Sequence, residues 1–174
     1  MISVLIPTLN SERFLLPTLS ALVAGSAEGL LREVILADGG STDGTARIAD
    51  AAGCDFRPGP PEETERLRAA AATARGSWLL ILRPQSAPEE GWTREVAKFV
   101  ESAERAGGPG QSAAFRYAID GYGFDHRLRE LAAALRGALI GPRPEQGLLV
   151  AKRDYAGPRR PRAVVLRTRV VLPG

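Results

Sequence analysis

The sequence predicts an α/β fold, with a mostly parallel sheet and helices on both of its faces. Two observations lead to this prediction: strand-like and helix-like segments alternate through the first half of the chain, and the strand-like runs are continuously apolar. Continuous apolar runs are typical of strands that are buried on both faces. The 174 residues suit one domain, so we expect a single domain over residues 1–174.

Each predicted element has a local reason. Pro7 ends the first apolar run, and Pro17 suits an early position in the helix that follows. Gly53 and Gly76 come after helical segments, and glycine commonly ends a helix. The predicted strands are Ile2–Ile6, Glu33–Ala37, Cys54–Phe56, Trp78–Leu82, Ala113–Asp120, Gly147–Ala151 and Ala163–Leu172. The predicted helices are one through Leu19, Leu22 and Val23, then Thr45–Ala52, Glu62–Arg75, Thr93–Arg105 and Asp125–Leu139.

The composition excludes several kinds of site. One Cys and one His cannot supply an internal disulfide, a Cys/His zinc site or a His-based triad. No apolar run approaches the roughly 18 residues of a membrane span, and the N-terminus does not read as a secretory signal. We therefore expect a cytoplasmic protein whose chemistry rests on carboxylates, arginines, hydroxyls and backbone groups.

The positive charge is concentrated at the end of the chain. Residues 151–174 hold seven basic side chains against Asp154 alone, a net charge of +6, whereas residues 1–150 carry −3. Such a segment could meet nucleic acid or an anionic membrane. Arginines interleaved with Val and Leu are also typical of an edge strand that charge protects from aggregation. We favour the edge strand and do not expect nucleic acid as a partner.

Three predicted loops follow strand ends, which is where ligands bind in open α/β sheets. These loops are Pro7–Arg13, Asp38–Thr45 and Arg83–Pro88. The first offers several hydrogen-bonding side chains, and the glycines of the second make its backbone accessible. An ionised Asp38 only accepts hydrogen bonds, so it could bind a ribose hydroxyl or a base N–H. We interpret Asp43 and Thr45 instead as a turn with a helix cap.

Two of these loops carry a family resemblance. Ser3–Glu12 and Glu33–Thr45 resemble the start of a family 2 glycosyltransferase of the GT-A fold, and Ala71–Leu82 is similar to the same family. Further on, Phe115–Gly121 and Gly141–Tyr155 resemble the branch of the family that is often found with radical-SAM or selenium-associated genes. The resemblance covers residues 1–155 and is strongest up to residue 92.

The resemblance implies a three-layer GT-A sandwich with a short C-terminal half. Residues 1–92 would be the nucleotide-binding half, and residues 93–174 a reduced acceptor-side half. The substrate would be a UDP- or GDP-linked sugar, transferred to the hydroxyl of an acceptor that the sequence does not specify. The residues that would bind the nucleotide sugar are Pro7, Thr8, Asn10, Glu12, Asp38, Gly39, Gly40, Arg68 and Gln85.

The sequence departs from the family pattern where the metal belongs. After Ile81-Leu82 the family has an Asp-x-Asp motif for Mn or Mg, whereas this chain has Arg83-Pro84-Gln85. Arginine cannot ligate a cation, so we expect no metal and no other cofactor. Where the family commonly has an arginine and an asparagine facing the phosphates, Glu63 and Arg68 stand here.

The catalytic base of the family is also in question. The Gly-Asp-Gln-Gly of the branch becomes Pro144-Glu145-Gln146-Gly147, which retains a carboxylate at Glu145. The Glu-Asp segment that usually supplies the base is missing between Tyr155 and Arg162. Glu145 is therefore the candidate base in this sequence.

Two hypotheses fit these departures. In the first, Arg83 replaces the cation and contacts the diphosphate, with Arg66 or Arg68 as a second contact, and Glu145 acts as the base. In the second, catalysis is lost and a pseudo-glycosyltransferase acts as a binding or interaction module. Whether the protein is an enzyme stays open at this point. The stripe Leu128, Leu131, Leu135 and Leu139 is most simply a core face, although it could form a homodimer face or a membrane-surface face if residues 156–174 leave it uncovered.

Overall fold

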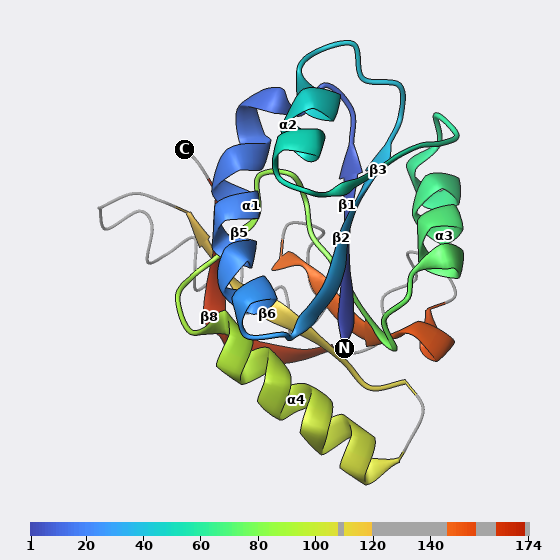
Figure 1. Ribbon diagram of the computed structural model, residues 1–174. Helices are drawn as coiled ribbons and strands as arrows, with labels where there is room; N and C mark the ends of the chain where they lie inside the picture. The colour runs from blue at the N-terminus through green and yellow to red at the C-terminus, as the bar shows by residue number, and fades with distance from the viewer. Residues whose placement is uncertain (108–109, 120–145, 156–162, 173–174) are drawn as a thin grey trace.

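The computed structural model describes residues 1–107, 110–119, 146–155 and 163–172 (Figure 1). The predicted helix Asp125–Leu139 and Glu145 lie outside the described residues. The described strands are β1 Ile2–Thr8, β2 Leu31–Asp38, β3 Asp55–Pro58, β4 Trp78–Ile81, β5 Ala87–Pro88, β6 Ser112–Ile119, β7 Leu148–Ala151 and β8 Ala163–Leu172. The helices are α1 Glu12–Ala27, α2 Thr45–Ala51, α3 Glu63–Thr73 and α4 Trp92–Ala106, with a short 3-10 helix at Lys152–Asp154.

The described strands form one mixed sheet in the order β3-β2-β1-β4-β7-β6-β8-β5. The four strands of the first half are parallel to one another, as the continuous apolar runs predict. β7 is antiparallel to both of its neighbours, β4 and β6, whereas β6 and β8 are parallel. The parallel half therefore brings the ends of β3, β2, β1 and β4 to one edge of the sheet.

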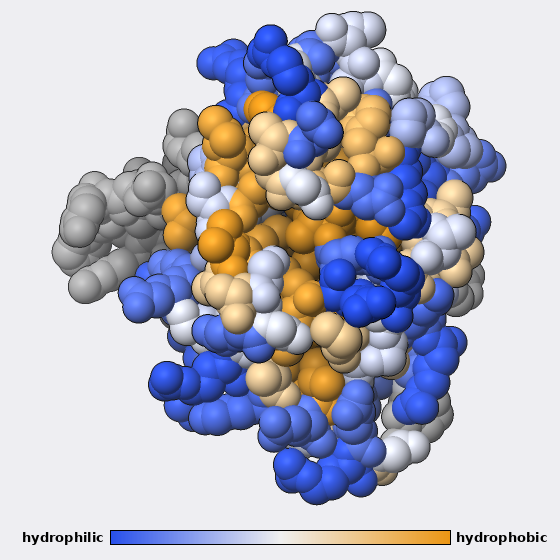
Figure 2. All heavy atoms as spheres, in the orientation of Figure 1, coloured by the Kyte–Doolittle hydropathy of each residue, from blue (hydrophilic) through white to orange (hydrophobic). Residues whose placement is uncertain are grey.

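Helices cover both faces of this sheet and make three layers, with α3 on one side and α1 and α2 on the other (Figure 1). Alternate residues of β1 face the two sides: Val4 and Ile6 join the core beneath α1, whereas Leu5 joins the core beneath α3. The side of α1 that faces away from the sheet stays partly apolar, with Leu16 and Val23 exposed. Figure 2 shows apolar residues across the middle of this face and hydrophilic residues over α4.

Several boundaries differ from the sequence prediction. β1 does not end at Pro7 but continues through it to Thr8. α1 begins at Glu12, so Pro17 lies inside the helix instead of near its start. β3 is shifted towards Pro58, because it pairs with the end of β2 as far as Asp38. β5 was not predicted, since its two residues form a strand only by pairing with β8. For β3 and β5, pairing with a strand that is distant in sequence sets the bounds.

The basic C-terminal segment forms β8 next to the edge of the sheet, and the two-residue β5 is the edge strand. β5 covers β8 only at Val170 and Val171. Among the described residues, no strand pairs with the outer side of β8 before Val170. The edge-strand prediction is therefore wrong for Val170 and Val171, which β5 covers, and stands for the part of β8 before them. No helix in the described part of the chain is long and apolar enough to cross a membrane.

Candidate functional site

The candidate site lies where β2, β1 and β4 end side by side. Thr8 at the end of β1 pairs with Asp38 at the end of β2, and Leu5 pairs with Ile81 of β4. Neighbouring strands are about 4.8 Å apart, so the ends of β2 and β4 are separated by about 10 Å. Pro7 and Thr8 are buried in β1, and Gln85 lies partly buried in the turn after β4. The segments predicted to form one site are thus brought together.

Asp38 organises the loop that follows it. Its side chain is buried, and one carboxylate oxygen accepts hydrogen bonds from Thr8 Oγ1 at 2.8 Å and from Ser41 Oγ at 2.5 Å. The other oxygen accepts from the backbone N–H groups of Gly40 at 2.8 Å and Ser41 at 2.7 Å. Burial alone would raise the pKa of Asp38, but these hydrogen bonds hold the pKa below its ordinary value. Asp38 is therefore ionised at neutral pH, with its oxygens facing four donors.

The binding role predicted for Asp38 remains a prediction. A carboxylate offers about four acceptor positions, and the loop already uses four. A ribose hydroxyl would have to replace one of these donors, of which Gly40 is an exposed residue and Ser41 a partly buried one.

The first two loops hold each other through hydrogen bonds. The backbone N–H of Asn10 donates to Ser41 Oγ at 2.8 Å, and the side-chain oxygen of Asn10 accepts from the Thr42 N–H at 2.8 Å. Asn10 adopts a left-handed backbone, with φ of 48°, which asparagine tolerates better than most residues. The exposed Asn10 therefore positions the second loop, and its contact with a nucleotide sugar stays a prediction.

Glu12 and Asp43 make a reciprocal pair of helix-end contacts. The Glu12 N–H donates to the Asp43 carboxylate at 3.1 Å, and the Glu12 carboxylate accepts from the Gly44 N–H at 2.9 Å. Asp43 also accepts from the Thr45 N–H at 3.0 Å, which confirms the predicted turn. The predicted cap is wrong, because Gly44 occupies the cap position of α2 and no side chain makes the cap hydrogen bond. A Cβ at Gly44 would lie 2.3 Å from the Glu12 carboxylate, so a larger residue there would displace that side chain from the Gly44 N–H. Glu12 is thus engaged in holding the loop.

Arg66 does not face a ligand position. It is buried, with Nε donating to the Ala37 carbonyl at 2.8 Å and Nη1 donating to the carbonyls of Pro60 and Pro61 at 2.8 and 2.9 Å. Gly39 lies against it, and a Cβ there would be 2.8 Å from Nη1. The hypothesis that Arg66 contacts phosphate is therefore wrong in this arrangement, because its donors hold the backbone between β3 and α3.

Arg83 and Glu63 form an ion pair beside these loops. Arg83 Nη1 lies 2.5 Å from Glu63 Oε2, and their side chains are 28% and 41% exposed. The turn that carries Arg83 is fixed, because the Ser86 N–H donates to the Arg83 carbonyl and Thr18 Oγ1 donates to the Pro84 carbonyl. Two of the positions at which the sequence is expected to depart from the family pattern thus contact each other.

Tyr155 belongs to the same neighbourhood, and the sequence had not marked it as a site residue. Burial raises the pKa of the Tyr155 hydroxyl, the positive charge of Arg68 lowers it, and the negative charge of Glu63 raises it. Tyr155 packs against the core cluster that includes Leu67 and Ala70, so it lies beside α3, the helix that carries Glu63 and Arg68. Tyr155 reaches this place because β7 pairs with β4, which no local signal in the sequence indicates.

Residues 3–127 match the family model described as glycosyl transferase family 2. The chain belongs to this family. A search of curated protein sequences gave no significant match.

Solved structures show the same fold for this glycosyltransferase family member. Glucosyl-3-phosphoglycerate synthase from Mycobacterium tuberculosis, in complex with Mn2+ and UDP-glucose, is 23% identical with a TM-score of 0.59, over 88% of this chain and 56% of that chain. A mycobacterial protein is 22% identical with a TM-score of 0.61, over 99% and 65%. S. aureus TarS, residues 1–349, is 20% identical with a TM-score of 0.53, over 70% and 37%.

These similarities show that the chain has the GT-A fold. The chain spans little more than half the length of the synthase that it matches.

The residues at the usual metal position of the family do not fit a divalent cation. Arg83 offers donors only, and its partner Glu63 is one carboxylate already used by the ion pair. Within the described ranges, no group of three or more His, Cys, Asp or Glu side chains could hold a metal ion. The prediction that this glycosyltransferase family member works without a metal stays a prediction.

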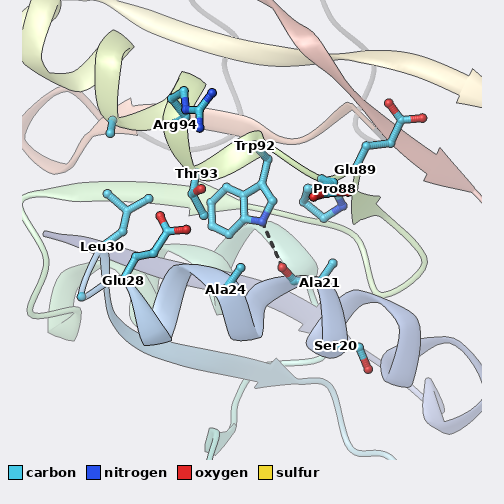
Figure 3. A pocket seen from close by; sticks show the side chains of 14 residues that line it. Ser20, Ala21, Ala24, Glu28, Leu30, Pro88, Glu89, Trp92, Thr93 and Arg94 are labelled. Atoms are coloured by element: carbon cyan, nitrogen blue, oxygen red, sulfur yellow. Dashed lines mark hydrogen bonds between the residues drawn. The ribbon is translucent and has the colours of Figure 1, made fainter.

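An open groove of about 1230 Å³ lies elsewhere, between the end of α1 and the start of α4 (Figure 3). Trp92 forms part of its wall, donating from its indole nitrogen to the Ala21 carbonyl at 2.9 Å. Trp92 is buried and belongs to the core cluster beneath α1. Glu28 and Leu30 line the groove just before β2 begins, at the opposite end of that strand from Asp38.

Proposed function

We propose that this glycosyltransferase family member binds a nucleoside-diphosphate sugar across the ends of β2, β1 and β4. The nucleoside would contact the loop of Asp38, and the diphosphate would extend towards Arg83. The observation that carries the proposal is that a partly exposed guanidinium lies two strands away from Asp38, at the same edge of the sheet. The complex of the M. tuberculosis synthase with UDP-glucose supports this substrate class.

In this proposal sugar transfer is metal-independent. The bond between the anomeric carbon and the diphosphate breaks, the acceptor oxygen bonds to that carbon, and the acceptor proton passes to a carboxylate. Arg83 would stabilise the leaving diphosphate, with Arg68 as a second positive charge, because guanidinium groups form charge-assisted hydrogen bonds to phosphate oxygens. Glu145, outside the described residues, is the proposed base.

The remaining assignments belong to the same proposal. Residues 1–92 would hold the nucleotide sugar, and residues 93–174 would supply the acceptor side. The choice between UDP and GDP, a homodimer, the cytoplasmic location and membership of the radical-SAM- or selenium-associated branch stay predictions.

A second candidate is a non-catalytic pseudo-glycosyltransferase that acts as a binding or interaction module. One observation favours it: the two groups expected to meet the substrate, Asp38 and Arg83, already have partners within the chain. Such a module would retain the fold and transfer no sugar.

Calorimetric titration with UDP, GDP and UDP-glucose tests the binding, once with EDTA and once with Mn2+. We expect binding in EDTA that Arg83→Gln weakens at least threefold, whereas Arg94→Gln, which removes an exposed arginine of α4, leaves it unchanged. Absence of binding to all three ligands would refute the proposal. Release of UDP from UDP-glucose separates the two candidates, because only an enzyme produces it.

A further inference from the structure

We propose that Glu63 is a competitor for the diphosphate, held on Arg83 as an ion-pair latch that an incoming diphosphate displaces. Glu63 would thereby set the affinity of the site for its anionic ligand. This inference rests on the proposed function, since it concerns the same arginine.

The exposure of the ion pair allows an exchange of partners. Both side chains reach solvent, with 28% of Arg83 and 41% of Glu63 exposed. Glu33, at the start of β2, shows the opposite arrangement: its side chain is 4% exposed and accepts hydrogen bonds from Ser3 and from both the backbone and the side chain of Arg75. Glu33 is enclosed by its partners, whereas a ligand can reach Arg83 while Glu63 withdraws into water.

Glu63 is not required to cap its own helix. The Glu62 carboxylate accepts from the Glu65 N–H at 2.7 Å and so caps the start of α3. The described contact of the Glu63 carboxylate is the ion pair with Arg83. Releasing Glu63 therefore leaves the helix end intact.

Carboxylates and phosphates use the same donors of a guanidinium, so they compete for it. A diphosphate carries more negative charge and more acceptor oxygens than one carboxylate. Once bound, it therefore forms stronger contacts with Arg83 than Glu63 does. Glu63 lowers the net affinity in two ways, because its ion pair must be broken and its charge then repels the anion. Removing the charge of Glu63 should therefore tighten anion binding, provided that Arg83 is present.

The test is calorimetric titration with inorganic pyrophosphate and with UDP, in EDTA at low salt. We expect Glu63→Gln to tighten pyrophosphate binding about threefold to tenfold, which combines the usual strength of a partly exposed ion pair with the lost repulsion. Glu65→Gln, which removes the charge of an exposed residue on the same helical turn, is the matched control and should change affinity less than twofold. Thermal melting of each variant verifies that it is folded.

The double variant Glu63→Gln/Arg83→Gln separates the latch from a general effect of charge. We expect it to lose the gain in affinity, and retention of the gain would overturn the latch. Equal pyrophosphate affinity of Glu63→Gln and Glu65→Gln would also overturn it, while leaving the proposed function standing if UDP binds. A gain for pyrophosphate without any binding of UDP would support the latch and refute the nucleotide proposal. Failure of every variant to bind either ligand would refute both.

Discussion

Arg66 allows a test of which contacts stabilise the sheet near Asp38, at the end of β2. Its guanidinium donates to three backbone carbonyls, those of Ala37, Pro60 and Pro61, at 2.8 to 2.9 Å. A hydrogen bond from a charged donor contributes about 1.5–3 kcal/mol. Pro60 and Pro61 are exposed, so water can replace the donor at their carbonyls, whereas Ala37 is buried. We therefore expect Arg66→Ala to lower the free energy of unfolding by about 2–4 kcal/mol.

Urea unfolding followed by circular dichroism measures this loss. Arg66→Lys should recover less than half of it, because one ammonium group cannot reproduce a planar fork that reaches separate carbonyls. Arg68→Ala, on the exposed side of the same helix, is the control and should stay within about 0.5 kcal/mol of the wild type. A stability of Arg66→Ala within that same range, or full recovery by lysine, would show that these hydrogen bonds do not stabilise the fold.

Two further predictions concern packing and pH. Gly25→Ala should destabilise the protein by about 1–2 kcal/mol in urea unfolding, because its Cβ would lie 2.7 Å from the Trp92 ring. The same substitution should cost less in a Trp92→Phe background. An unfolding midpoint of Gly25→Ala equal to that of the wild type would contradict the prediction. Burial raises the pKa of Glu33, but hydrogen bonds from Ser3 and Arg75 outweigh it and lower the pKa below the ordinary 4.5. The contribution of ionised Glu33 to the stability of the fold is therefore complete above pH 4.5 and is lost as pH falls through the lowered pKa. Glu33→Gln should flatten this acid dependence of unfolding, and an unchanged slope would refute that role.

Local patterns predicted much of the fold. The apolar runs located the parallel strands, and α4, which begins at Trp92, ends before Gly107, whose φ is 67°. The rule that parallel strands end at one edge correctly predicted that Thr8 and Asp38 lie together. These features depend on residues that are near in sequence, or on a general rule of sheet architecture, so a single sequence suffices.

The missed features depend on partners that are distant in sequence. Burial and hydrogen bonding turn Arg66 towards backbone carbonyls, although its sequence position is equally compatible with a phosphate contact. β5 exists because β8 pairs with it, and its two residues have no strand pattern of their own. Tyr155 comes near α3 through the pairing of β7 with β4. Spacing along the chain does not report such contacts.

The sequence by itself determined that this chain is a GT-A member of glycosyltransferase family 2. That Arg83 stands where the family has its metal motif stays a prediction. Motif and periodicity are properties of neighbouring residues, which is why they can be read directly. Only the tertiary structure decided that Arg83 pairs with Glu63, 20 residues earlier, because α3 has to pack against β1 and β2 before the two side chains can meet. That contact makes Glu63 the residue through which we expect diphosphate affinity to be set.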